Sequence, residues 1–210
     1  MKVDGARRRP AVLALVGASG TGKTTLLCAL LPRLRAAGLR VGVVKHSHHE
    51  IEVDRPGKDS HRLRKAGAEE TLLVSSSGWA LMADTSGDRP ELAEAIDRFS
   101  GALDLVLVEG YRDADCPKLE LVRPVLGCPP LYPEDPRVLA VATNGPLPAP
   151  TERPVLPLDD VEAIAAFLLG CLAPDVSLAA SGERVEKSWV PERDAAPPRH
   201  ESGLSTAASA

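Results

Sequence analysis

The feature that most constrains this chain is the stretch Gly17-Ala18-Ser19-Gly20-Thr21-Gly22-Lys23-Thr24, which matches the pattern G-x-x-x-x-G-K-[ST] in full. An unbroken apolar run at residues 11–16 precedes it, as is typical of a parallel strand buried on both faces. Apolar residues at helical spacing follow from Thr24 onward, so the stretch connects a strand to a helix. A phosphate-binding loop needs that context, and we predict that residues 17–25 bind the phosphates of a nucleotide.

The residue types of this loop suit a bound anion. Its glycines allow a positive φ, so the backbone can wrap closely around a phosphate with its N–H groups facing inward. Lys23 is placed to reach the β- and γ-phosphates, and the Thr24 hydroxyl is placed to bind Mg²⁺. An ordinary glycine-rich turn is the structural alternative. The candidate nucleotide-binding residues here are Gly17, Ala18, Ser19, Gly20, Thr21, Gly22, Lys23, Thr24 and Thr25.

Composition narrows the class of protein. The chain has 210 residues, 44% of them hydrophobic and 26% charged, which predicts a globular protein with one well-buried core. A formal net charge of -4 argues against a general nucleic-acid-binding surface. No apolar run is long enough to span a membrane, and the start of the chain lacks the apolar stretch of a signal peptide, so we expect a cytoplasmic protein. The cysteines form no C-x-x-C pair, which argues against a structural zinc site or a disulfide framework.

Three segments are expected along the chain. Residues 1–9 form a flexible basic leader, residues 10–173 a P-loop nucleotide-binding domain, and residues 174–210 a disordered tail. Alternating strand and helix patterns in the domain predict a three-layer α/β P-loop NTPase fold with a mainly parallel sheet flanked by helices. Strands are expected at 11–16, 39–44, 70–75, 78–82, 103–109, 117–123, 138–144 and 154–158, and helices at 24–37, with a kink or restart at Pro32, near 59–66, at 89–99 and at 160–172.

Polar residues follow two of these strands. Lys45, at the start of the run Lys45-His46-Ser47-His48-His49, would be drawn to an anion at the loop, because ligands of open α/β sheets lie beyond the carboxyl ends of strands. The histidines could bind a metal, but a solvated or phosphate-facing loop is the better interpretation. Glu109 ends a buried strand; we expect it to act in catalysis with Lys23 and to hold Mg²⁺ directly or through water, although it could instead cap a helix.

The segment from Asp54 to Ala68 combines a turn with a short basic helix. We expect Lys58 and Arg62 to face phosphate or substrate and Asp54 to be a metal partner, against the alternative of a charged surface helix. Asn144, in a turn after a buried strand, is placed where a loop that reads the base could lie.

Taken in order, these motifs resemble the molybdopterin-guanine dinucleotide biosynthesis protein B family. The resemblance covers about residues 10–172. It implies a dimeric GTP-binding protein with Mg²⁺ that hydrolyses GTP slowly and assists a molybdopterin guanylyltransferase in attaching GMP to the molybdopterin cofactor. It rests on Gly17 to Thr25, Lys45 to His49, Asp54, Pro56 to Ser60, Arg62, Ala66 to Ala68, Val108 to Tyr111 and Pro117 to Glu120.

Asn144 departs from this family, because the resemblance implies an aspartate near the purine at that position. An asparagine offers a donor and an acceptor, whereas a carboxylate only accepts hydrogen bonds from the guanine edge. Two other functions therefore stay open. One is an ATP-dependent small-molecule kinase in which Arg62 and Arg64 neutralise the transferred phosphoryl group. The other is an adaptor that binds a nucleotide without hydrolysing it.

Overall fold

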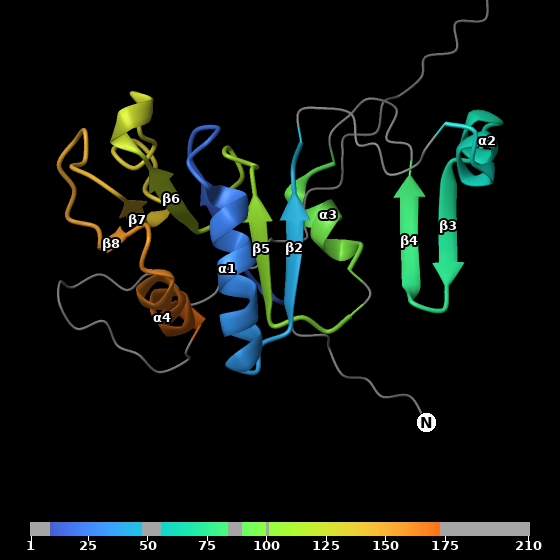
Figure 1. Cartoon of the computed structure of the whole chain (residues 1–210), viewed down its shortest axis with the longest axis horizontal. Coiled ribbons are helices and arrows are strands. Elements are labelled where there is room, and N and C mark those ends of the chain that lie inside the picture. Colours follow the sequence, from blue (N-terminus) through green and yellow to red (C-terminus); the bar gives the residue numbers. More distant parts are fainter. Residues whose placement is uncertain (1–8, 48–55, 84–89, 100, 173–210) are drawn as a thin grey trace, which may run out of the picture.

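The computed structural model describes residues 9–47, 56–83, 90–99 and 101–172, and its centre is a six-stranded parallel sheet (Figure 1). The strand order is β2-β5-β1-β6-β7-β8, so β1 lies between β5 and β6. The strands of this sheet are β1 (Ala11–Val16), β2 (Val41–Lys45), β5 (Leu105–Glu109), β6 (Lys118–Val122), β7 (Val138–Thr143) and β8 (Val155–Pro157).

Helices cover the sheet on both faces, which confirms the predicted three-layer α/β fold. Alternate residues of a strand point to opposite faces, so a strand covered on both sides is apolar throughout. Leu13 and Leu15 of β1 pack with α1 (Lys23–Ala36) and α4 (Val161–Leu172), whereas Val12 and Ala14 pack toward α3 (Leu92–Asp97). No helix among the described residues has both the length and the apolar character needed to cross a lipid bilayer.

Helix α1 continues through Pro32 as one element, so the restart that we considered there does not occur. Proline removes one backbone hydrogen bond and crowds the preceding turn. Leu30 and Leu34, on either side of it, are fully buried and anchor both halves of the helix to the sheet. The helix ends as predicted at Gly38, whose φ is 87° and whose N–H donates to the carbonyl of Arg35.

The remaining two strands form a separate antiparallel hairpin. Strands β3 (Glu70–Ser75) and β4 (Gly78–Ala83) lie where the sequence predicts strands, but they pair only with each other. Helix α2 (Asp59–Lys65) lies beside β3, and Figure 1 shows this unit on the β2 side of the molecule, beyond α3. The predicted helix at 89–99 is shorter in the structure, where α3 begins at a capping box between Glu91 and Glu94.

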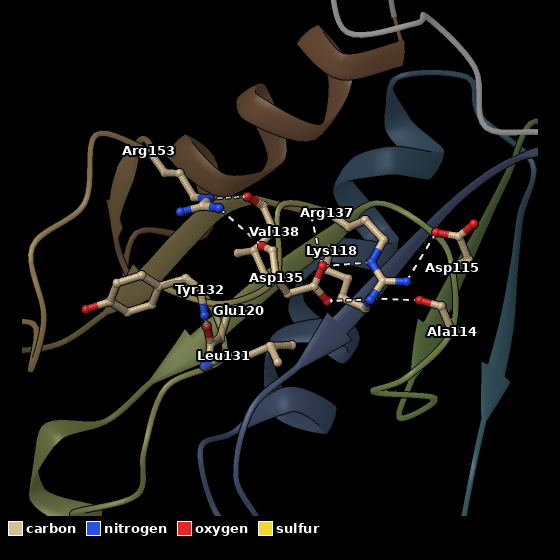
Figure 2. A network of polar contacts seen from close by, with 10 residues as sticks. All are labelled: Ala114, Asp115, Lys118, Glu120, Leu131, Tyr132, Asp135, Arg137, Val138 and Arg153. Atoms are coloured by element: carbon tan, nitrogen blue, oxygen red, sulfur yellow. Dashed lines mark hydrogen bonds and ion pairs between the residues drawn. The ribbon is translucent and has the colours of Figure 1, made fainter.

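Strand β6 carries two charged residues that are buried. The period-two pattern predicts that Lys118 and Glu120 share a face of the strand, and that face is covered by the segment that follows β6. The Lys118 ammonium, 0% exposed, donates to the Ala114 carbonyl at 2.7 Å and to Asp135 at 2.9 Å. The guanidinium of Arg137 donates to the same carboxylate at 2.7 Å, so two cations neutralise Asp135 (Figure 2).

Glu120 attaches the covering segment to the sheet by a second set of bonds. Its carboxylate accepts hydrogen bonds from the backbone N–H groups of Leu131 and Tyr132, at 2.6 and 2.7 Å (Figure 2). Burial raises the pKa of Glu120, while these two N–H groups act in the opposite direction. The segment after β6 is therefore held to the sheet by buried polar contacts as well as by the apolar side chain of Tyr132, which is 0% exposed.

Removing the Asp135 carboxylate should destabilise the protein strongly. Burial alone would raise the pKa of Asp135, but hydrogen bonds from Arg137 and Lys118 outweigh it and hold this pKa well below its usual range. Asp135→Ala leaves the Lys118 charge buried without its carboxylate, so we expect the free energy of unfolding in denaturant to fall by about 3 to 5 kcal/mol. Because the pKa of Asp135 is lower in the folded protein than in the unfolded chain, its contribution to stability is fully present above about pH 4, where an aspartate of the unfolded chain is ionised. This contribution should decline as the pH falls below that value.

Asp115→Ala is the matched control for this variant. Asp115 also accepts a hydrogen bond from Arg137, at 3.1 Å, but its side chain is 81% exposed. Exposed ion pairs stabilise proteins by about 0 to 1 kcal/mol, so its unfolding curve should stay close to that of the parent protein. Equal losses in the two variants would contradict a special role for the buried carboxylate.

Candidate functional site

The loop between β1 and α1 has the backbone conformation of a phosphate cradle. Its three glycines, Gly17, Gly20 and Gly22, have φ values of 137°, 80° and 98°. At Gly17 a Cβ atom would lie 2.4 Å from the carbonyl oxygen of Leu121 in β6, so only glycine lets the loop approach that strand so closely. The tip of the loop at Gly20 is exposed and therefore accessible to a ligand.

Two side chains of the loop bond back to its own backbone. The hydroxyl of Thr21 donates to the carbonyl of Ala18 at 2.9 Å, and the ammonium of Lys23 donates to the carbonyls of Gly17 and Ala18 at 2.9 and 2.8 Å. Burial lowers the pKa of Lys23; the charge of Glu109 opposes this effect, and that of Lys45 adds to it. An anion bound in the loop would favour the charged form of Lys23, because opposite charges stabilise each other.

Thr24, Glu109 and Lys45 meet at the start of α1. The Thr24 hydroxyl lies 2.7 and 2.9 Å from the two oxygens of the Glu109 carboxylate and donates toward them. The Lys45 ammonium donates to the Thr24 hydroxyl at 3.1 Å and lies 3.3 Å from the nearer Glu109 oxygen. Parallel pairing of β2 with β5 sets Lys45 directly opposite Glu109, so the sheet itself positions both groups.

The donor set at this point fits a magnesium ion. Hydroxyl and carboxylate oxygens are the ligands that Mg²⁺ prefers in proteins. Thr24 and Glu109 supply one of each on atoms that already lie within hydrogen-bonding distance. Within the described ranges, no group of three or more His, Cys, Asp or Glu residues could hold a metal by itself, so protein ligands alone would leave room for water and phosphate oxygens around the ion.

Other predicted site residues lie elsewhere. Lys58 and Arg62 are exposed on the α2 unit; in the described part of the chain, the one ion pair of Arg62 is with Asp59, at 3.4 Å. Figure 1 shows α2 at the far side of the hairpin from α1. Asn144 lies exposed in the bend that follows β7. Asp54 falls outside the described residues, as do His48 and His49, and the roles of all these residues stay predictions.

The sequence reasoning missed Arg123. This residue follows β6 directly, and its Nε donates to the backbone carbonyl of Thr21 in the loop at 2.8 Å. The signal that indicated Lys45, a cation just after a buried parallel strand, applies equally to Arg123. The period-two pattern of residues 117–123 predicts only a strand with charges on one face, and it gives no role to the last residue.

The sequence patterns give no indication of the contacts made by the turn after Glu109, although Val108 to Tyr111 belong to the family resemblance. Tyr111 has a φ of 49°, which is uncommon for a non-glycine residue. Its hydroxyl donates to the carbonyl of Pro90 at 3.0 Å, and its ring lies 5.2 Å from the ring of His46. The N–H of His46 in turn donates to the carbonyl of Glu109 at 2.8 Å. These contacts join the ends of β2 and β5 next to Glu109.

A family profile, two curated relatives and a solved structure point to the same family. A family profile described as "Molybdopterin guanine dinucleotide synthesis protein B" matches residues 12–144. The "Molybdopterin-guanine dinucleotide biosynthesis adapter protein" of Escherichia coli (strain K12) is 44% identical over 163 residues, covering 75% of this chain and 91% of that protein. A protein of the same name from Haemophilus influenzae is 43% identical over 159 residues, covering 75% and 86%. The crystal structure of a MobB protein homolog from Bacillus stearothermophilus, 28% identical, superposes with a TM-score of 0.57 over 77% of this chain and 97% of that one.

Proposed function

The chain belongs to the molybdopterin guanine dinucleotide synthesis protein B family, and from that premise we propose that it is a GTP-binding adapter protein of molybdenum cofactor biosynthesis. It binds GTP with Mg²⁺ at the P-loop, hydrolyses it slowly and assists a molybdopterin guanylyltransferase in attaching GMP to molybdopterin. The observation that carries the nucleotide part of this proposal is the contact between Thr24 and Glu109 beside Lys23, at distances that suit a phosphate-bound metal.

Each residue of the site has a role in this proposal. Thr24 and Glu109 hold Mg²⁺, directly or through water, and the bound ion neutralises charge on the phosphates. Lys23 exchanges its two loop carbonyls for the β- and γ-phosphate oxygens. Lys45 adds a second positive charge on the same side, and Glu109 orients the attacking water.

The remaining predicted residues divide between base and substrate. Asn144, beyond the end of β7, reads the purine of the nucleotide. Lys58 and Arg62 lie on the separate α2 unit, and their exposed charges suit contact with the phosphate of molybdopterin or with the partner guanylyltransferase. Asp54 is a further candidate for the metal side of the site.

Replacing Lys23 by alanine should weaken nucleotide binding sharply. A charge-assisted hydrogen bond is worth about 1.5 to 3 kcal/mol, so the dissociation constant of GTP should rise by roughly 10- to 150-fold. Competitive binding of GTP and ATP with Mg²⁺ to the full chain measures both the affinity and the base preference. The exposed Lys65, in the last turn of α2, gives the control variant Lys65→Ala, which should bind GTP like the parent protein.

Unchanged GTP binding in Lys23→Ala would contradict the placement of the phosphate site. A preference of the parent protein for ATP would favour the small-molecule kinase instead. Such a kinase consumes ATP only when an acceptor is added, whereas the proposed adapter hydrolyses GTP slowly without one.

Replacing Glu109 by glutamine should reduce hydrolysis more than binding. The amide keeps the size of the side chain and an oxygen acceptor for Thr24, but it removes the charge that orients the metal and the water. We expect single-turnover GTP hydrolysis to fall about 100-fold, with a change of less than about tenfold in GTP affinity. An equal loss of both would argue against this role, and tight GTP binding by the parent protein without turnover would favour a non-hydrolysing adaptor.

We also propose that the protein is a homodimer, with the hairpin at the contact. Leu72 pairs with Leu81 and Val74 with Trp79 across the hairpin, so these four side chains share one face of it. All are exposed, Val74 by 75% and Trp79 by 55%. A cluster of large apolar side chains in contact with water is typical of an interaction surface. A second copy of the chain offers a matching apolar face.

Val74→Asp should shift this dimer toward monomer, because it places a charge in the centre of the apolar face. Sedimentation velocity of the full chain at several concentrations measures the change. Val125→Asp is the matched control, since Val125 is 86% exposed but lies in the short helix after β6, so this variant should sediment like the parent protein. A parent protein that is monomeric at all concentrations would contradict the proposal.

A further inference from the structure

We propose that Arg123 is a nucleotide-binding residue: its Nε holds the P-loop, and its terminal nitrogens contact the phosphates of the bound nucleotide. The inference deepens the proposed function and rests on it. Arg123 comes directly after β6, and Nε donates to the Thr21 carbonyl at 2.8 Å. Nη2 lies 3.5 Å from the point where a Cβ atom on Gly22 would stand, so the guanidinium extends along the loop to the residue that caps α1.

The guanidinium keeps unused hydrogen-bonding capacity. Of the hydrogen bonds and ion pairs in the described ranges, the Arg123 side chain takes part in one, through Nε. Two other arginines near β6 are different: Arg137 pairs with Asp135 and Asp115, and Arg153 donates to the carbonyls of Val138 and Asp135. Arginine presents five N–H donors in a planar fork that matches phosphate geometry, so a half-buried, carboxylate-free guanidinium beside this loop suits an anionic ligand.

The strand order places the Arg123 charge on the side of β1 away from Lys45 and Glu109. Lys45 and Glu109 come from β2 and β5, on one side of β1, and Arg123 comes from β6 on the other side. The carboxylate of β6, Glu120, accepts hydrogen bonds from the N–H groups of Leu131 and Tyr132, and no ion pair joins it to Arg123 in the described ranges. A nucleotide in the loop would therefore have Lys23 and Lys45 on one flank and Arg123 on the other.

A purely structural role predicts a different result from phosphate contact. If Arg123 only shapes the loop, its loss weakens GDP and GTP by the same factor, because both bind the loop through their phosphates. If its terminal nitrogens bind phosphate, the loss grows with the charge of the ligand and is absent for a nucleoside. Competition against a fluorescent guanine nucleotide, with guanosine, GDP and GTP as competitors on the full chain with Mg²⁺, separates the two.

For Arg123→Gln we expect GDP to bind roughly 10-fold and GTP roughly 100-fold more weakly, with guanosine unchanged within about twofold. Arg123→Lys keeps the charge but not the fork, so it should recover part of the GDP affinity. It also covers the case in which the glutamine variant fails to fold. Arg35→Gln, an exposed arginine in the last turn of α1, is the control and should match the parent protein.

An equal loss for GDP and GTP would overturn the inference, because it indicates a role in shaping the loop alone. An equal loss for guanosine and GDP would overturn it too, as would unchanged affinity for all three ligands in both Arg123 variants. Lys23→Ala, measured in the same assay, separates this failure from that of the proposed function. Loss of binding in Lys23→Ala with none in Arg123→Gln would overturn the role of Arg123 and leave the nucleotide site standing. A parent protein that binds neither guanine nor adenine nucleotides would overturn both.

Discussion

Parallel pairing of β1 with its neighbours is the constraint on which the site depends. Because β1 pairs in parallel with β5 and with β6, the carboxyl ends of all three strands open on the same edge of the sheet. The loop that follows β1 therefore lies between Glu109, at the end of β5, and Arg123, directly after β6. The contact between Thr24 and Glu109 then joins the first turn of α1 to the strand beside it.

The sequence predicted those parts of the site whose signals are local. The loop, the strand before it and the helix after it lie in one continuous stretch of sequence. Lys45 and Glu109 each end an apolar strand, and the structure brings both of them into contact at the start of α1. The burial of Lys118 was not predictable in the same way. Its partner Asp135 lies in the segment after β6, and no pattern in a single strand indicates a counter-ion so distant along the chain.

The hairpin shows the same limit at the level of the fold. Its two strands have the expected apolar composition, and their positions were predicted correctly. Propensity identifies a strand but not the sheet that it joins, because pairing depends on which edges are available. Here β3 pairs with β4 alone and leaves Leu72 and Val74 exposed, so the residues that look most like core in that stretch form surface. Arg123 differs from these cases because its signal is local: like Lys45, it is a cation at the end of a buried parallel strand.

The absence of space at Gly17 has an evolutionary consequence. Every other amino acid adds a Cβ atom, and at 2.4 Å from the Leu121 carbonyl that atom meets backbone, which no change of rotamer can move aside. A substitution of Gly17 is therefore not neutral unless β6 shifts away from β1. Such a shift would also displace Arg123 from the Thr21 carbonyl. Position 17 and the end of β6 are bound to change together or to stay as they are.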